Sequence, residues 1–485
     1  MYACQALQYE RFASARAVRA WLLAHQREMS PRGWPASPRP TEPPLVVALV
    51  GASQFWLPAA NETLQCAGSA SFLPNFDDRS FCVRGQFASG GFTMYDAERR
   101  LLNRWFRYPH TCSISLPAES LLGNLPSSSA CLKRADLIIA ATPIHQFLRR
   151  PDLWKSRLLG GPGPFPIGTT YIPMFNYQVF REMPGKFEAW WTQLRKLATQ
   201  FHRPRILVHY SHPFDLHVSQ TFLRGLYRQP DWFQRRTVVA CYEANVRDDV
   251  RKRLRDGLNA TLLSVPHTTS AWTRPPGLAV RSSLNKRGRR NRVLLQGKLQ
   301  RGKATAIRLR FAAEIRAAGG TCVGSRCVVG ARSESKSVVS ARLKATNYTL
   351  WGDELESEFC LQPPGDVLTR SHFYVSVQAG CIPVVVEGGL GSAYSEDGVT
   401  AWAWRDQVPW KDLAVPVAWP YNGSVVEILE AINAERIHQM RTALDEYANL
   451  TMFGDGSFDD AFTTLVGWLQ RHPQPRVGKK RRVER

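Results

Sequence analysis

Short runs of consecutive apolar residues alternate with longer amphipathic stretches along most of this chain. Each run has the length and uninterrupted apolar character of a strand buried on both faces of a parallel sheet. Such runs occupy residues 46–50, 135–141, 205–210, 237–241, 293–297, 358–361 and 382–386. Helical spacing of apolar residues is found over 95–106, 188–200, 305–318, 373–379 and 424–444. Strands that alternate with helices predict an α/β fold with parallel sheets.

The length and two breaks in this pattern predict the domain organisation. A chain of 485 residues is too long for one hydrophobic core. Residues 30–44 are rich in proline and predict a linker, and a second break falls at 273–290. We therefore expect two Rossmann-like, doubly wound domains at 45–275 and 285–468. An N-terminal segment at 1–44 and a basic disordered tail at 469–485 flank them.

The charge of the chain is strongly basic. Lys and Arg number 63 against 40 Asp and Glu, which gives a formal net charge of +23. Such a charge favours polyanionic partners without choosing among nucleic acid, acidic polysaccharide, anionic membrane and phosphorylated ligands. The basic residues gather in the Arg281–Arg310 region and in the tail at Lys479–Arg482. Basic residues interleaved with stacking aromatics are missing, so we expect no nucleic-acid partner, although a basic protein that binds polyanions or nucleic acid remains a rival hypothesis.

Cysteines and glycosylation sequons favour a secretory compartment. The ten cysteines lack zinc-ligand spacing, and three local pairs are candidate disulfides, with free buried thiols as the alternative: Cys66/Cys82, Cys112/Cys131 and Cys322/Cys327. Five sequons begin at Asn61, Asn259, Asn347, Asn422 and Asn449. The first 28 residues lack the apolar centre of a signal peptide, and the early run Leu45–Ala52 is far shorter than the ~20 residues that span a bilayer. We expect no membrane anchor within this chain. Either the sequence is truncated or the protein is not a conventional secretory enzyme.

The segment Phe359–Val384 carries the strongest chemical signal. Its sequence, FCLQPPGDVLTRSHFYVSVQAGCIPV, predicts a strand, a Pro-Pro-Gly-Asp turn, a helix and a second strand. Thr369 is placed to cap the helix, and Arg370 falls in its first turn, where the helix dipole disfavours a cation. A cation at that position suits a bound anion, because backbone N–H groups at a helix start and one Arg together form a diphosphate site. The alternative is that Arg370 pairs with a surface acid.

This segment resembles the signature of the exostosin family, glycosyltransferase family 47. Weaker similarity surrounds it at 134–140, at 291–297 with Arg308, at 403–415 and at 428–440. One departure is Tyr374-Val375-Ser376, where the family commonly has Phe-Asp-Ala. The similarity covers roughly residues 95–468. The missing carboxylate motivates another rival hypothesis, a catalytically degenerate, glycan-binding relative.

The resemblance implies an inverting glycosyltransferase of GT-B architecture, with two domains facing a cleft. The expected donor is a nucleoside-diphosphate sugar, usually a UDP-sugar, and the acceptor a glycan or glycoprotein, acidic glycans included. We expect no metal, no permanently bound cofactor and a location in the Golgi or secretory lumen. The candidate donor-binding residues are Gly297, Arg301, Arg308, Thr369, Arg370 and Glu387. An equally good interpretation of Glu387 is that it is a solvated acid in a loop and binds no donor.

An inverting transfer also needs a general base that removes the proton of the acceptor hydroxyl. The base is expected from the first domain, where Asp136, His209 and His212 lie at or near the ends of predicted strands. Asp136 and His212 are the candidates. A structural role is the alternative for each.

Overall fold

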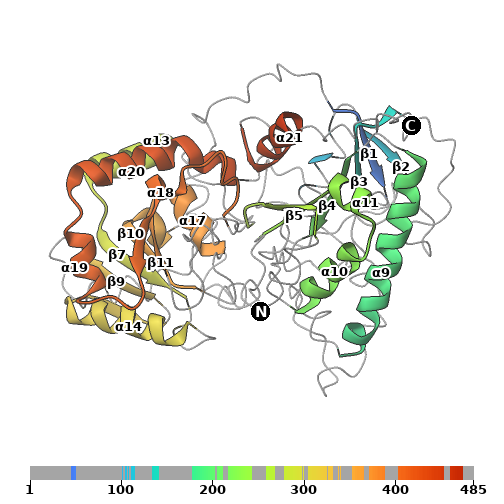
Figure 1. Ribbon diagram of the computed structural model, residues 1–485. Helices are drawn as coiled ribbons and strands as arrows, with labels where there is room; N and C mark the ends of the chain where they lie inside the picture. The colour runs from blue at the N-terminus through green and yellow to red at the C-terminus, as the bar shows by residue number, and fades with distance from the viewer. Residues whose placement is uncertain are drawn as a thin grey trace, which may run out of the picture.

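The computed structural model describes the chain in part. The described residues are 45–50, 101, 104–105, 108, 111–114, 134–140, 177–201, 205–210, 217–242, 258–267, 278–297, 299, 304–324, 326–330, 337, 339, 352–364, 371–387, 402–452 and 459–472. Within them lie two six-stranded sheets, one in each half of the chain. Figure 1 shows the two sheets with their helices as two groups of elements, with the helix Ala461–Arg471 (α21) between them.

The first sheet is parallel throughout, in the order β2-β1-β3-β4-β5-β6. Its strands are β1 (Val47–Val50), β2 (Thr111–Ile114), β3 (Leu137–Ala140), β4 (Arg205–Tyr210), β5 (Thr237–Cys241) and β6 (Thr261–Ser264). The helices whose bounds the structure describes in this half are α9 (Tyr177–Gln200), α10 (His217–Tyr227) and α11 (Asp231–Arg236). The aromatic rings of Trp191 and Phe222 pack α9 against α10, with ring centroids 4.9 Å apart. The predicted strands at 46–50, 135–141, 205–210 and 237–241 are therefore confirmed.

The second sheet is mixed, in the order β12-β11-β10-β7-β9-β8. Its strands are β7 (Asn291–Gln296), β8 (Thr321–Val323), β9 (Arg326–Gly330), β10 (Ser357–Gln362), β11 (Ile382–Glu387) and β12 (Val415–Ala418). Strands β7, β10, β11 and β12 are parallel, whereas β9 pairs antiparallel with both β7 and β8. The sequence pattern does not predict this antiparallel hairpin, because β8 is three residues long and only partly buried.

Helices surround the second sheet. They are α13 (Leu278–Arg287), α14 (Thr305–Ala317), α16 (Gly352–Leu355), α17 (Ser371–Ala379), α18 (Trp410–Leu413), α19 (Val425–Glu430) and α20 (Ala434–Tyr447), followed by the 3₁₀ helix η3 (Ala448–Thr451). The prediction of one long helix over 424–444 is wrong. Asn433 begins a separate helix, because its side chain accepts a hydrogen bond from the N–H of Arg436, 2.8 Å away, as an N-cap. The predicted break at 273–290 also contains a helix, α13.

Two disulfides stabilise the second sheet. Cys322–Cys327 joins β8 to β9 and confirms one predicted pair. Cys360–Cys381 joins β10 to the residue that precedes β11, and the sequence analysis did not pair these cysteines. Cys241, the last residue of β5, is buried. The pairs Cys66/Cys82 and Cys112/Cys131 include residues outside the described part of the chain.

Candidate functional site

The order of strands in the second sheet marks one edge for ligand binding. After β7 the chain builds β8 and β9 on one side, and it then places β10 on the other side of β7. Such a reversal between adjacent parallel strands is a topological switch point, where open α/β sheets bind ligands outside the carboxyl ends of the strands. The expected site therefore lies past the ends of β7 and β10.

Three predicted residues belong to this edge. Gly297 directly follows β7 and has φ 131°, a backbone conformation that residues with a Cβ rarely adopt. Arg308 in α14 is buried, and its Nη2 donates to the carbonyl oxygen of Pro364 at 2.9 Å. Pro364 lies two residues after the end of β10 and is the second residue of the Pro-Pro-Gly-Asp turn. Glu387 is the last residue of β11, which lies parallel to β10. The structure thus brings Gly297, Arg308 and Glu387 to one edge.

The other donor-site candidates lie outside the described residues. These are Arg301, Thr369 and Arg370. Helix α17 begins at Ser371, directly after Arg370, so the predicted strand-turn-helix order of the signature is confirmed on both sides of the turn. Their roles in binding a diphosphate remain predictions.

Two further polar residues, which the sequence analysis did not single out, join the end of β10 to α17. Gln362 is buried at the end of β10, and its Nε2 donates to the Oγ of Ser376 at 2.8 Å. The Ser376 hydroxyl also lies 2.9 Å from the carbonyl oxygen of His372, to which it donates within the helix. These bonds hold the first turns of α17 against the strand that leads into the signature turn. A buried polar residue just before Pro-Pro was the available signal for Gln362.

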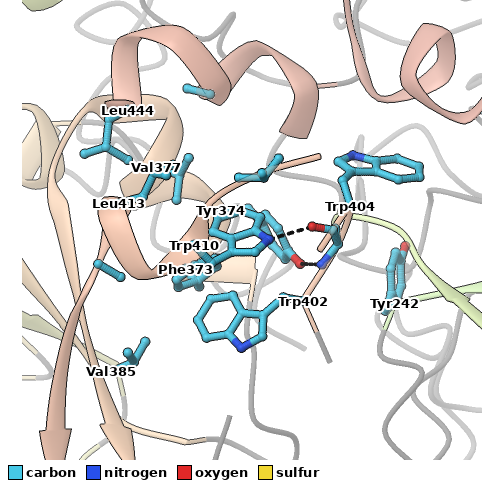
Figure 2. Packing of buried hydrophobic residues seen from close by; sticks show 14 of the residues in the cluster. Tyr242, Phe373, Tyr374, Val377, Val385, Trp402, Trp404, Trp410, Leu413 and Leu444 are labelled. Carbon is cyan, nitrogen blue, oxygen red and sulfur yellow. Dashed lines mark hydrogen bonds between the residues drawn. The ribbon is translucent and has the colours of Figure 1, made fainter. Parts of the chain in front are cut away.

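The position at which the exostosin family commonly has an aspartate lies in the interior of this protein. Val375 in α17 is fully buried, so the departure from the family pattern changes an interior side chain rather than an exposed one. Its neighbours Phe373 and Tyr374 pack into the aromatic cluster of Figure 2, in which Phe373 lies 4.4 Å from Trp402 and 5.3 Å from Trp410 between ring centroids. The segment 402–410 therefore packs directly on the signature helix.

Backbone groups of Ala403 tie the same cluster together. The Ala403 N–H lies 3.4 Å from the hydroxyl of Tyr374, and the indole N–H of Trp410 donates to the Ala403 carbonyl at 2.7 Å. Figure 2 shows both bonds. They fix the orientation of Tyr374, whose ring faces the first half of the chain.

Residues that follow β5 and β6 contact the signature helix. Tyr242 follows β5, and its ring stacks on His267, three residues beyond β6, with centroids 4.2 Å apart. The His267 ring lies 5.8 Å from that of Tyr374. Both Tyr242 and His267 are buried. The carboxyl edge of the first sheet therefore meets α17 directly, and the sequence pattern contained no signal for this contact.

Of the three residues considered for the general base, the structure describes Asp136 and His209 but not His212. Asp136 precedes β3, and its carboxylate accepts a hydrogen bond of 3.0 Å from the N–H of Val46. It therefore lies at the amino end of its strand, away from Tyr242 and His267, so its prediction as a base is not supported. His209 lies inside β4, buried, and its Nε2 accepts from the indole N–H of Trp105 at 3.0 Å. His212 is outside the described residues, two positions after β4 ends.

Several arginines of the basic Arg281–Arg310 region are internal. Arg281 and Arg289 are buried at the end of α17, where Arg281 Nη2 lies 2.7 Å from Asp445 and Arg289 Nη2 donates to the Ala379 carbonyl at 3.2 Å. Arg292 forms an ion pair with Glu358 in β10. These three side chains are therefore engaged within the fold.

Within the described residues, no group of three or more His, Cys, Asp or Glu side chains is arranged to hold a metal ion. Among the helices that the structure describes, none has both the length and the apolar character needed to span a bilayer.

The segment that matches a known protein family includes the whole second sheet. Residues 233–430 match the Exostosin GT47 domain, a segment that begins in α11 and ends with α19. This match supports an exostosin-like GT47 glycosyltransferase domain over these residues. The resemblance on Phe359–Val384 is thereby confirmed, and this exostosin domain contains the switch point, Arg308 and the whole signature.

Three curated relatives from Arabidopsis thaliana match shorter segments. Xyloglucan-specific galacturonosyltransferase 1 is 33% identical over 99 residues, which are 20% of this chain and 13% of that protein. Probable xyloglucan galactosyltransferase GT12 is 34% identical over 117 residues, 23% of this chain and 22% of the relative. Probable xyloglucan galactosyltransferase GT15 is 58% identical over 40 residues, 8% of each chain. The chain thus spans less than a quarter of the length of each relative.

Proposed function

We propose that this protein is an inverting glycosyltransferase that moves a sugar from a UDP-sugar to a glycan acceptor in the Golgi or secretory lumen. The observation that carries the proposal is the switch point between β7 and β10 inside the exostosin domain. There, Arg308 binds the carbonyl oxygen of Pro364 in the signature turn. A GT-B arrangement, in which the first sheet supplies the acceptor side and the second sheet the donor side, accounts for the contact of His267 with Tyr374.

The proposed donor site assigns a task to each residue of this edge. Arg308 positions the Pro-Pro-Gly-Asp turn, and Arg370 and Arg301 supply positive charge to the diphosphate that leaves. Gly297 lets the backbone approach the nucleotide closely, and N–H groups at the start of α17, beginning with the predicted cap Thr369, bind phosphate oxygens. Glu387, at the end of β11, accepts from the ribose hydroxyls. Positive side chains perform the charge neutralisation here, so the proposal requires no metal ion.

The transfer itself forms one bond and breaks one. The acceptor oxygen bonds to the anomeric carbon from the face opposite the diphosphate, the bond from that carbon to the diphosphate oxygen breaks, and the acceptor proton passes to the base. His212 is our candidate for this base, because it follows the carboxyl end of β4, the edge at which Tyr242 and His267 meet α17.

The names of the relatives suggest which substrates to test first. Those proteins are named as xyloglucan galactosyltransferases and a xyloglucan galacturonosyltransferase. We therefore propose UDP-galactose and UDP-galacturonate as donors and a β-glucan-type oligosaccharide, such as one from xyloglucan, as acceptor. The net charge of +23 is compatible with an acidic glycan as acceptor or product.

The test measures UDP binding and turnover in matched variants. Arg370→Ala should weaken UDP binding about 10- to 100-fold, because a charge-assisted hydrogen bond contributes roughly 1.5–3 kcal/mol. His212→Ala should keep UDP binding and lower kcat by at least about 100-fold. Arg316→Ala is the control, since it removes an exposed charge from α14, the helix that carries Arg308, and should change neither quantity.

Three outcomes separate this proposal from its rivals. Turnover with inversion, seen by NMR of the product anomer, supports the transferase. UDP binding that Arg370→Ala abolishes, without turnover on any donor tried, would favour the degenerate glycan-binding relative. No UDP binding together with salt-sensitive binding of RNA or polyanions would overturn the proposal.

A further inference from the structure

Three of the five sequons lie within the described residues, and the structure places them differently. Asn422 is exposed in the turn between β12 and α19, and the next residue, Gly423, is also exposed with φ +76°. Asn259 is exposed before β6, but its amide donates to the carboxylate of Asp231 at 2.5 Å. Asn449 is 3% exposed inside η3. The same tripeptide motif is therefore exposed at Asn422, exposed but hydrogen-bonded at Asn259, and buried at Asn449.

The turn at Asn422 can accept a large group without loss of its own contacts. Ser424, the third residue of the sequon, caps α19 by accepting from the N–H of Val426 at 3.1 Å. The carboxylate of Glu427 completes a capping box by accepting from the Ser424 N–H. These bonds use the backbone and side chain of Ser424, so the side chain of Asn422 is not part of the cap. A glycan on Asn422 would extend into solvent and leave α19 intact.

The Asn449 sequon is part of the interior. The Asn449 amide donates to the Asp459 carbonyl at 3.0 Å, and the hydroxyl of Thr451, fully buried, donates to the Ala448 carbonyl at 2.7 Å. Gln378 in α17 donates to the Thr451 carbonyl at 2.8 Å. A glycan on Asn449 would force these groups out of the core that supports α17. Any chain modified there fails to reach the folded state.

The compartment in which the chain folds follows from an independent observation. Cys322–Cys327 and Cys360–Cys381 are both disulfides, and structural disulfides form in oxidising compartments such as the endoplasmic reticulum lumen. That lumen is also where asparagine-linked glycans are attached. The disulfides and the exposed sequon thus agree on the same compartment without any assumption about catalysis.

We infer that Asn422 carries an asparagine-linked glycan in the folded protein and that Asn449 remains unmodified. The host transferase supplies an oligosaccharide on a lipid diphosphate. The Nδ2 of Asn422 bonds to the anomeric carbon of that oligosaccharide, the bond from this carbon to the diphosphate breaks, Nδ2 loses a proton and the lipid diphosphate leaves. This inference goes beyond the proposed function, and it holds whether or not the protein transfers sugar itself.

The experiment compares two Asn variants in the full chain. The protein is produced behind a secretion signal in eukaryotic cells, and the secreted, folded fraction is treated with peptide N-glycosidase in ¹⁸O-water before peptide mass spectrometry. We expect ¹⁸O-labelled conversion to Asp at Asn422 and none at Asn449. Asn422→Gln should remove one glycan step on a gel, whereas Asn449→Gln should remove none from secreted material.

Two variants at Ser424 separate the sequon from the helix cap. Ser424→Asn removes the sequon but keeps a residue that caps helices well, so it should lose the glycan and still be secreted. Ser424→Thr keeps both functions and should keep the glycan. A folded, secreted protein with no label at Asn422, or one labelled at Asn449, would overturn the inference. UDP binding, measured on the same samples, reports separately on the proposed function.

Discussion

At the scale of single residues, the most consequential finding is that two arginines support the end of the signature helix. Gly380 follows α17 with φ +69°, and a Cβ there would lie 2.8 Å from Nε of Arg281 and 3.0 Å from Nη2 of Arg289. Only glycine tolerates both the backbone angle and this close approach. The Gly of the Gly-Cys-Ile-Pro-Val motif is therefore required by packing against arginines from α13 and the residues after it.

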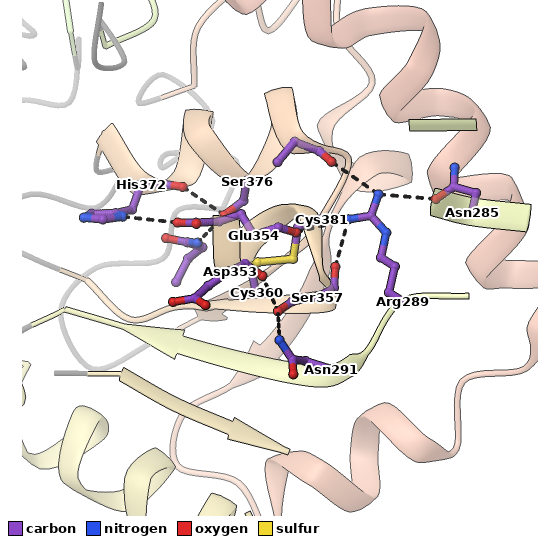
Figure 3. Close-up of a disulfide and its surroundings, with 12 residues drawn as sticks. Asn285, Arg289, Asn291, Asp353, Glu354, Ser357, Cys360, His372, Ser376 and Cys381 are labelled. Atoms are coloured by element: carbon purple, nitrogen blue, oxygen red, sulfur yellow. Dashed lines mark hydrogen bonds and ion pairs between the residues drawn. A yellow bond between two sulfur atoms is a disulfide. The ribbon is translucent and has the colours of Figure 1, made fainter. Parts of the chain in front are cut away.

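Arg289 is the better subject for a stability test. Figure 3 shows its guanidinium beside the Cys360–Cys381 disulfide, where Nη1 donates to the carbonyls of Glu354 and Ser357 and Nη2 to Ala379. Burial, together with the nearby positive charges of Arg441 and Arg281, lowers the pKa of Arg289 to about 9, so Arg289 stays protonated at neutral pH. The folded pKa lies below the unfolded one, so the charge itself costs stability below pH 9. The three carbonyl bonds offset that cost.

Arg289→Met should lower the free energy of unfolding by about 3 kcal/mol, because it leaves buried carbonyls without a donor. Urea denaturation followed by tryptophan fluorescence measures the change. Arg290→Met is the control: its side chain is exposed and lies 3.6 Å from Glu356, so the effect should stay within about 0.5 kcal/mol. Equal effects from the two variants would contradict the assignment.

At the scale of elements, β10, the signature turn and α17 form a closed loop. The Cys360–Cys381 disulfide closes it at a sequence separation of 21, and the Gln362–Ser376 hydrogen bond holds its two arms together. The sequence between the two cysteines includes Arg370. The family signature is thus a structural unit as well as a chemical one.

Removing the Cys360–Cys381 disulfide should lower both the stability of the protein and its affinity for UDP. The paired substitution Cys360→Ala with Cys381→Ala should lower the free energy of unfolding by about 3 kcal/mol, the loop-closure entropy for about 21 residues. UDP should bind more weakly as well, because the turn loses a constraint. The paired substitution Cys322→Ala with Cys327→Ala opens only the β8–β9 hairpin, so it should leave UDP affinity unchanged, and isothermal titration calorimetry on both proteins makes the comparison. Unchanged UDP affinity after loss of Cys360–Cys381 would contradict the expected link.

At the scale of the whole molecule, the last described helix joins the two halves. Although α21 follows all elements of the second sheet, Asp460 at its N-cap forms an ion pair of 2.6 Å with Arg104 in the first half. Phe462 packs edge-on against Trp105, with ring centroids 4.7 Å apart. Arg205 at the start of β4 lies 3.4 Å from the Leu469 carbonyl. The expected domain limit at 468 falls within this helix, and α21 packs against the first half.

This contact predicts coupling across 357 positions of the sequence. The ring pair Trp105–Phe462 should show a coupling free energy of about 1 kcal/mol in a double-mutant cycle with Trp105→Leu and Phe462→Leu, measured by chemical denaturation. The control cycle pairs Phe462→Leu with Phe187→Leu, since Phe187 packs on Phe222 of α10 instead. Additivity in the first cycle would contradict a direct contact between α21 and the first half.

Much of the strand pattern and the signature were predictable from the residues alone. A strand buried on both faces needs a run of apolar residues, so β1, β3, β4, β5, β7, β10 and β11 are visible in the sequence. The hairpin β8–β9 was not, because three partly buried residues have no distinctive period. The break between α19 and α20 was missed because the apolar spacing continues across Asn433, whose single capping side chain begins the second helix.

The sequence by itself determined the α/β class, the strand-turn-helix-strand signature and its family, since these depend on local apolar runs, turn residues and their order. Only the tertiary structure decided which polar residues are internal. It buried Arg281 and Arg289, placed Asp136 at the amino end of β3, and separated exposed Asn422 from buried Asn449. The physical reason is that burial and pairing depend on contacts between residues far apart in the chain, and no local pattern records them.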